Sequence, residues 1–82
     1  MRLLTLHELV TMTLNNNDKY FAVDRDNRAC SFPHMPVVDS TGQYWLPGPG
    51  GGTFTTLGTF DAKCDWMYTV CDATSITLRN VQ

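Results

Sequence analysis

Three cysteines and two histidines are the residues of this chain best suited to nucleophilic or metal chemistry. A structural zinc site needs four ligands in closely spaced pairs, and Cys30, Cys64 and Cys71 include no CxxC pair. His7 and His34 do not complete such a set, so we expect no metal and interpret the cysteines as reduced thiols. Three alternatives stay open: a disulfide between Cys64 and Cys71, a metal-binding cysteine, and a catalytic pair of Cys30 with His34.

Aspartates form two short clusters whose spacing suggests calcium binding or acid–base chemistry. Asp24 and Asp26 alternate like the first ligands of a calcium loop, but the glycine and glutamate that such a loop needs farther along are missing. Asp61 and Asp65 form the second cluster, which has no partner acid for glycosidase-type chemistry. We interpret both clusters as solvated turns, and we expect no catalytic residue, no cofactor and no enzymatic activity.

A glycine-rich loop occupies residues 47–52, which read Pro-Gly-Pro-Gly-Gly-Gly. Successive glycine amides are able to cradle an anion, but this loop lacks the lysine and hydroxyl residue of a P-loop and precedes a strand pattern. We interpret the loop as a connection between strands. Binding of a nucleotide or anion and contact with a partner protein stay open as alternatives.

Large aromatic side chains are the remaining candidates for function. A chain of 82 residues has too small a core to bury four large rings on one face. Because tyrosine and tryptophan often anchor protein interfaces, we predict that some of these rings form a binding patch beside the glycine-rich loop, although core filling is the alternative role. The predicted partner-binding residues are the rings and a polar rim: Tyr44, Trp45, Trp66, Tyr68, His34, Arg25 and Arg28.

The N-terminal residues predict a short amphipathic helix that begins at a capping box. The Thr5 hydroxyl is placed to accept from the Glu8 amide, while the Glu8 carboxylate reaches back to the Thr5 amide. Leucine or valine at positions 6, 9, 10 and 14 forms one apolar stripe, and three asparagines at 15–17 end the pattern. A helix this short is unstable alone, so its stripe must pack on other elements.

Short apolar and aromatic runs separated by turn residues predict the strands on which this helix packs. The run at 53–60 is the longest, with Phe54 and Phe60 expected on one face, Leu57 on the other, and Gly58 marking a bulge or a close approach. The expected strands are residues 20–23, 28–32, 43–46, 53–60, 66–71 and 75–79. The prediction is a single α+β domain over 1–82, with the helix packed on a twisted antiparallel sheet of four to six short strands.

Composition and charge narrow the classes of partner. Hydrophobic residues make up 43% of the chain and charged residues 17%, which is typical of a folded domain rather than a disordered tail. The net charge is −2 and the six basic residues are scattered, so we expect no direct binding to nucleic acid. No segment resembles a signal peptide or a membrane span, and we expect a cytoplasmic protein.

The order of these features resembles that of small accessory proteins of phages and prophages, including anti-CRISPR proteins and other inhibitors of host defence. The resemblance covers a capped helix directly after Met1, a Tyr-Phe-Ala-Val-Asp run, a Gly-Gln-Tyr-Trp run and a closing Cys-Asp-Trp run. It implies a stoichiometric inhibitor that binds a host protein complex, such as a CRISPR effector or another defence assembly, in the host cytoplasm. It implies no catalytic residue.

Two further hypotheses accompany this interpretation. An oligomer that sequesters a signalling nucleotide, using the glycine-rich loop and stacked rings, is the alternative function. A homodimer that covers an edge strand or an aromatic patch is compatible with either function.

Overall fold

The computed structural model describes residues 2–42, 44–49, 51–61 and 69–75 of the chain. Over these residues it has one N-terminal helix, α1, six short strands and a helical turn at 73–75, which confirms the predicted α+β class. The elements are α1 (Leu6–Asn15), β1 (Tyr20–Val23), β2 (Arg28–Phe32), β3 (Val37–Val38), β4 (Trp45–Leu46), β5 (Thr55–Thr59) and β6 (Cys71–Asp72).

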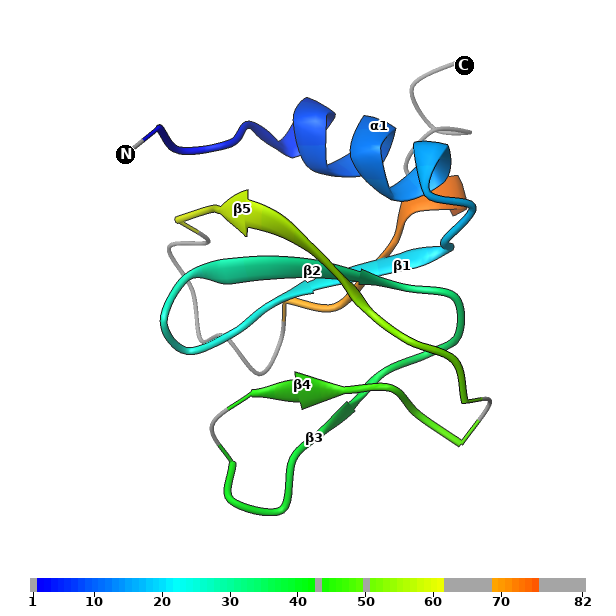
Figure 1. Ribbon diagram of the computed structural model, residues 1–82. Helices are drawn as coiled ribbons and strands as arrows, with labels where there is room; N and C mark the ends of the chain where they lie inside the picture. The colour runs from blue at the N-terminus through cyan, green and yellow to red at the C-terminus, as the bar shows by residue number, and fades with distance from the viewer. Residues whose placement is uncertain (1, 43, 50, 62–68, 76–82) are drawn as a thin grey trace.

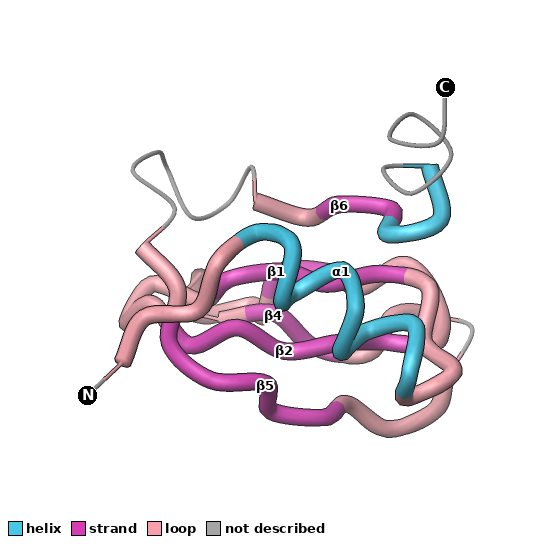
Figure 2. Tube along the Cα trace, turned by 90° about the horizontal axis from the view of Figure 1, so that it is seen from above, coloured by secondary structure: helices cyan, strands magenta, loops and turns pink. Residues whose placement is uncertain are grey.

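The strands form two sheets rather than one. Four strands pair antiparallel in the order β5-β2-β1-β6, while among the described strands β3 and β4 pair only with each other. Figure 1 shows α1 above the four-stranded sheet and the β3–β4 hairpin below it, and Figure 2 shows α1 lying over β1 and β2. The sheet is therefore covered on both faces, by different elements.

The central strands β1 and β2 are apolar at nearly every position because both of their faces are buried. Alternate side chains of a strand point to opposite faces. On the helix side, Phe21 and Ala29 join the cluster that α1 covers. On the hairpin side, Ala22, Cys30 and Phe32 form a second cluster.

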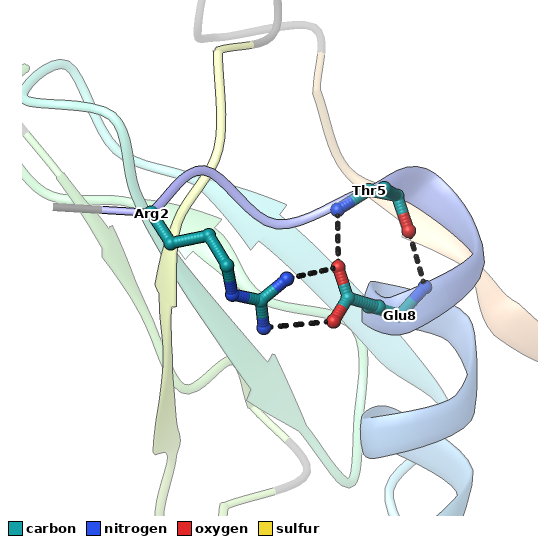
Figure 3. Close-up of polar contacts among 3 residues, drawn as sticks. All are labelled: Arg2, Thr5 and Glu8. Carbon is teal, nitrogen blue, oxygen red and sulfur yellow. Dashed lines mark hydrogen bonds and ion pairs between the residues drawn. The ribbon is translucent and has the colours of Figure 1, made fainter.

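The capping box that begins α1 is present as the sequence predicts. The Thr5 hydroxyl accepts from the Glu8 amide at 3.1 Å, and the Thr5 amide donates to the Glu8 carboxylate at 2.9 Å. Arg2 adds a bidentate contact to the same carboxylate, with N···O distances of 3.0 and 2.8 Å (Figure 3). These donors, led by Arg2, lower the pKa of Glu8 to about 2.

The buried face of α1 differs in one position from the predicted stripe. Leu9 and Val10 are buried, but Leu6 is 49% exposed, so its assignment to the stripe is wrong. Thr13 lies on the buried face instead, and its hydroxyl donates to the Leu9 carbonyl at 2.6 Å. This internal hydrogen bond satisfies the buried hydroxyl, so a threonine can occupy a core position.

A threonine hydroxyl extends the hydrogen bonding of β1 beyond its pairing with β6. Tyr20 and Phe21 pair with β6, but the pairing does not reach Val23. There the Thr69 hydroxyl accepts from the Val23 amide at 2.9 Å and contacts the Val23 carbonyl at 3.0 Å. One buried side chain thus replaces two ladder hydrogen bonds.

A β-bulge in β5 lies where the glycine indicated one. Ala29 pairs with Gly58 and Cys30 pairs with Thr56, which leaves Leu57 as the additional residue. The prediction of a bulge at this point is confirmed.

The bulge also overturns the predicted face of Phe60, whereas Phe54 and Leu57 lie on opposite faces as predicted. Leu57 and Phe60 both pack against the helix-side cluster, because the additional residue changes the alternation between them. Phe54 packs on Phe32 of the hairpin-side cluster, with ring centroids 6.0 Å apart. Gly58 has φ +150°, and a Cβ there would lie 2.8 Å from a methyl of Leu4, so glycine also makes room for the N-terminal segment.

The predicted strands near the C-terminus are described only in part. Cys71 belongs to β6, as expected for the end of the run at 66–71, but residues 62–68 lie outside the described residues. Ser75 lies in the helical turn at 73–75, so the expected strand at 75–79 is wrong at its first residue, and the rest of it lies outside the described part. The Asp72 carboxylate accepts from the Thr74 amide at 2.9 Å, which favours a turn here.

The carboxylate of Glu8 gives a prediction about acid stability. Its pKa falls from 4.5 in the unfolded chain to about 2 in the fold, so it stabilises the fold above pH 4.5 and this contribution is lost as the pH falls towards 2. We expect Glu8→Gln to remove this part of the pH dependence, as measured by urea midpoints between pH 2 and 5.

Arg2→Gln is the matched variant. It removes the largest cause of the lowered Glu8 pKa and leaves the hydrogen bonds of Thr5 in place. Its Glu8 should titrate between the wild-type and unfolded values in an NMR titration. A wild-type Glu8 that titrates near 4.5 would contradict the geometry of this cap.

Candidate functional site

The candidate site is an open hollow between the β1–β2 turn and the β3–β4 hairpin, on the sheet face opposite α1. Its volume is about 640 Å³, within the range of about 300–1,000 Å³ that is typical of binding pockets. The lining combines one apolar part with one charged part. The lining residues are Asp24, Arg25, Asp26, Arg28, Cys30, Tyr44, Trp45, Leu46 and Phe54.

The apolar part of the hollow comes from β4, from Cys30 of β2, and from the rings that precede β4 and β5. Trp45 is 7% exposed and belongs to the hairpin-side cluster with Cys30. Tyr44 and Phe54 remain 43% and 49% exposed. The hollow therefore has a buried tryptophan in its lining and two accessible rings, which is an arrangement that suits an apolar ligand group.

The charged part comes from the tight turn between β1 and β2. The Asp24 amide donates to the Arg28 carbonyl at 2.8 Å, and the Asn27 amide donates to the Asp24 carbonyl at 2.9 Å. The Asp26 carboxylate accepts from the Arg28 amide at 3.1 Å, and Asn27 takes a positive φ of 68°, which asparagine tolerates. This turn presents Arg25, Asp26 and Arg28 to solvent, and it confirms the turn predicted from the Asp24 cluster.

Asp24 connects this turn to the hairpin. Its carboxylate accepts from the Trp45 amide at 2.8 Å, across the gap between the two sheets. Burial, the largest effect, raises the pKa of Asp24, while the Trp45 hydrogen bond lowers it. Asp26 raises that pKa further, so the carboxylate is held in a position that disfavours its charge.

Cys30 lies in the lining as a buried thiol. Burial is the main effect that raises its pKa, and Asp24 raises it further. Its Sγ lies 4.0 Å from the Thr56 hydroxyl. A thiol with a raised pKa stays protonated near neutral pH and is a poor nucleophile, so the geometry gives no support to catalysis by Cys30.

The structure brings together four of the seven residues that the sequence predicted as partner-binding. Arg25, Arg28, Tyr44 and Trp45 all line the hollow. His34 is exposed in the loop after β2, beyond the strand end opposite to Arg28, and does not line it. The remaining two predicted residues, Trp66 and Tyr68, lie outside the described residues.

Sequence reasoning did not assign the other five lining residues to the site: Asp24, Asp26, Cys30, Leu46 and Phe54. The sequence predicts a turn at Asp24, but nothing local indicates a hydrogen bond to Trp45, which is 21 residues away. Phe54 is expected on the strand face opposite to Leu57, where the structure places it, but nothing local indicates that this face lies beside the hairpin. The available signal is the run at 29–32, where three of four residues are apolar, since a strand without alternation indicates a cover on both faces.

The glycine-rich loop packs against the segment that follows β2. A Cβ at Gly48 would lie 2.0 Å from the Met35 carbonyl oxygen, and one at Gly52 would lie 2.7 Å from a ring carbon of Pro33. The Gly51 amide donates to the Gly48 carbonyl at 2.9 Å. These contacts give Gly48 and Gly52 a packing role in the connection between β4 and β5.

The other candidate groups give no assembled site in the described part of the chain. Among those residues, no group of three or more histidine, cysteine or acidic side chains is placed to hold a metal ion. His7 is exposed in the first turn of α1. Cys64 and Asp65, and with them the disulfide and the second aspartate pair, lie outside the described residues.

Comparisons with protein-family models, with curated proteins and with solved structures gave no match for this chain. Over the described residues, the structure contains no helix with the length and apolar character needed to cross a membrane.

The Asp24 contact gives a prediction that separates its hydrogen bond from its charge. Asp24→Ala leaves the Trp45 amide without its acceptor, and we expect the free energy of unfolding to fall by about 1–3 kcal/mol. Asp24→Asn keeps an acceptor oxygen and removes the poorly solvated charge, so its stability should lie within about 1 kcal/mol of wild type. Urea denaturation at pH 7 measures both.

The pH dependence provides the control. Because folding raises the Asp24 pKa, its carboxyl stabilises the fold most below its unfolded pKa, and this contribution is lost as the pH rises through the folded value. In the Asp24→Asn variant, this decrease in the free energy of unfolding with rising pH should be absent. Equal destabilisation by the two variants would contradict the role of the hydrogen bond.

Proposed function

We propose that this chain is a non-enzymatic binding protein of the phage accessory type, which inhibits a host defence complex by stoichiometric binding through the hollow. The observation that carries the proposal is the joining of two accessible rings, Tyr44 and Phe54, with two exposed arginines around one concave surface. The assignment of the target to a host assembly, such as a CRISPR effector, follows the sequence resemblance.

The composition of the hollow is that of an interface centre. Hot spots of protein interfaces are rich in tyrosine, tryptophan and arginine and lie in concave, well-packed places. Trp45 is held by the core and by Asp24, so a partner does not have to order it on binding. A preformed surface of this kind loses less entropy on association than a mobile one.

The size of the chain is sufficient for such an interface. A stable complex buries about 800 Å² on each partner, and the described structure exposes 5295 Å² in total. An interface of ordinary size therefore needs about one seventh of this surface. The hollow would be its centre, and the β1–β2 turn and the β3–β4 hairpin would supply its margin.

The volume of the hollow favours one second candidate, an oligomeric sponge for a signalling nucleotide. A space of about 640 Å³ accommodates a small molecule. Tyr44 is accessible for stacking on a base, and Arg25 and Arg28 are able to pair with phosphate. This candidate predicts a retained small molecule rather than a retained protein complex.

One experiment distinguishes the two candidate functions. The tagged full chain is recovered from host lysate and analysed by native mass spectrometry. We expect a complex of fixed stoichiometry with a host protein assembly for wild type. Tyr44→Ala and Phe54→Ala should each weaken capture about tenfold or more, as the loss of an interface anchor does.

Leu6→Ala is the matched control, because Leu6 is also 49% exposed but lies on α1, on the other side of the sheet. Circular dichroism and urea midpoints establish that each variant is folded. Equal capture by all four proteins would contradict the proposal. A homo-oligomer that carries a nucleotide-sized mass, and no host protein, would replace it with the sponge.

A further inference from the structure

The charged residues beside the hollow differ in how far their hydrogen-bonding capacity is already used. Asp24 accepts from the Trp45 amide, and Asp26 accepts from the Arg28 amide. Both acids thus have backbone donors within the fold.

The arginines are less engaged. Arg28 approaches Asp26 at 3.8 Å, with both side chains more than half exposed, and such a pair contributes little. Arg25 is exposed and forms no hydrogen bond or ion pair with the residues that the structure describes. Each guanidinium carries five N–H donors, so the unused capacity at this rim is that of donors to an anion.

The apolar side of the same hollow lies next to these donors. Tyr44 and Phe54 are accessible, and Trp45 and Leu46 complete the apolar lining. A ligand that uses both sides must present a large apolar group and an anionic group close together.

We infer that the hollow recognises a segment of the partner protein in which an acidic residue stands beside a large apolar side chain. The apolar side chain occupies the space between Tyr44 and Phe54, and the carboxylate pairs with Arg25. This inference rests on the proposed function and specifies the chemistry of the partner.

The charge balance favours a single carboxylate over a phosphate group. Two aspartates and two arginines line the hollow, so its lining has no formal net charge with all four ionised. A group with two negative charges would be repelled by Asp24 and Asp26, whereas one carboxylate needs one guanidinium. A basic segment would meet two arginines, and one oxygen of each aspartate already accepts from a backbone amide.

The test uses the folded full chain and a phage-displayed library of random heptapeptides. After selection, we expect peptides with aspartate or glutamate next to leucine, phenylalanine, tyrosine or tryptophan. A selected peptide is then synthesised with its acid and with the corresponding amide, and both are titrated by fluorescence polarisation. The amide form should bind about tenfold more weakly, as expected for loss of a charge-assisted hydrogen bond.

Two variants with the same loss of charge locate the contact. Arg25→Gln should lower the affinity for the acidic peptide about tenfold and leave the affinity for the amide peptide unchanged. Lys19→Gln is the control, because Lys19 is exposed and precedes β1 at the end opposite to Arg25. The Lys19→Gln variant should bind both peptides with the wild-type affinity.

The outcomes are distinct from those that test the proposed function. Selection of peptides without an acid, equal binding of acid and amide forms, or no selected peptide at all overturns the inference. If lysate capture still depends on Tyr44 and Phe54 in that case, the proposed function stands without it. Displacement of the peptide by adenosine monophosphate, with tighter binding than the peptide, overturns it in favour of the nucleotide sponge.

Discussion

The attachment of Trp45 to the central sheet is the constraint on which this side of the molecule depends. The β3–β4 hairpin pairs only two residues on each strand, and so small a sheet is unstable alone. It is held by the ring of Trp45, which packs with the cluster of Ala22, Cys30 and Phe32, and by its amide, which donates to Asp24. Because Trp45 and the hairpin line the hollow, this attachment also creates the candidate site.

Much of the fold follows from local patterns that the sequence displays openly. The capping box at Thr5 determines where α1 begins, and the turn at Asp24 places β1 and β2 as a hairpin with the predicted bounds. These features involve residues close in sequence, so short-range rules suffice. The separation into two sheets is not local, since it depends on β3 and β4 packing across the sheet rather than joining its edge.

The candidate site was predictable only in part for the same reason. Tyr44, Arg25 and Arg28 were chosen by residue type and lie at the hollow, while Trp45 combines a place in the core with a place in the lining. Its burial depends on which face of the hairpin meets β2, which adjacent aromatic residues do not reveal. Phe54 lies opposite to Leu57, as strand alternation predicts, but the approach of the hairpin to that face is not local.

Amide hydrogen exchange of Trp45 in the native chain tests most directly whether the hairpin is fixed to the sheet. Two amides serve as references, that of Asp24, which donates to Arg28 at 2.8 Å within the sheet, and that of Thr41, which donates to an exposed carboxylate. A fixed hairpin predicts that Trp45 exchanges as slowly as Asp24. Exchange of Trp45 as fast as that of Thr41 would show that the hairpin opens independently and that no preformed hollow exists.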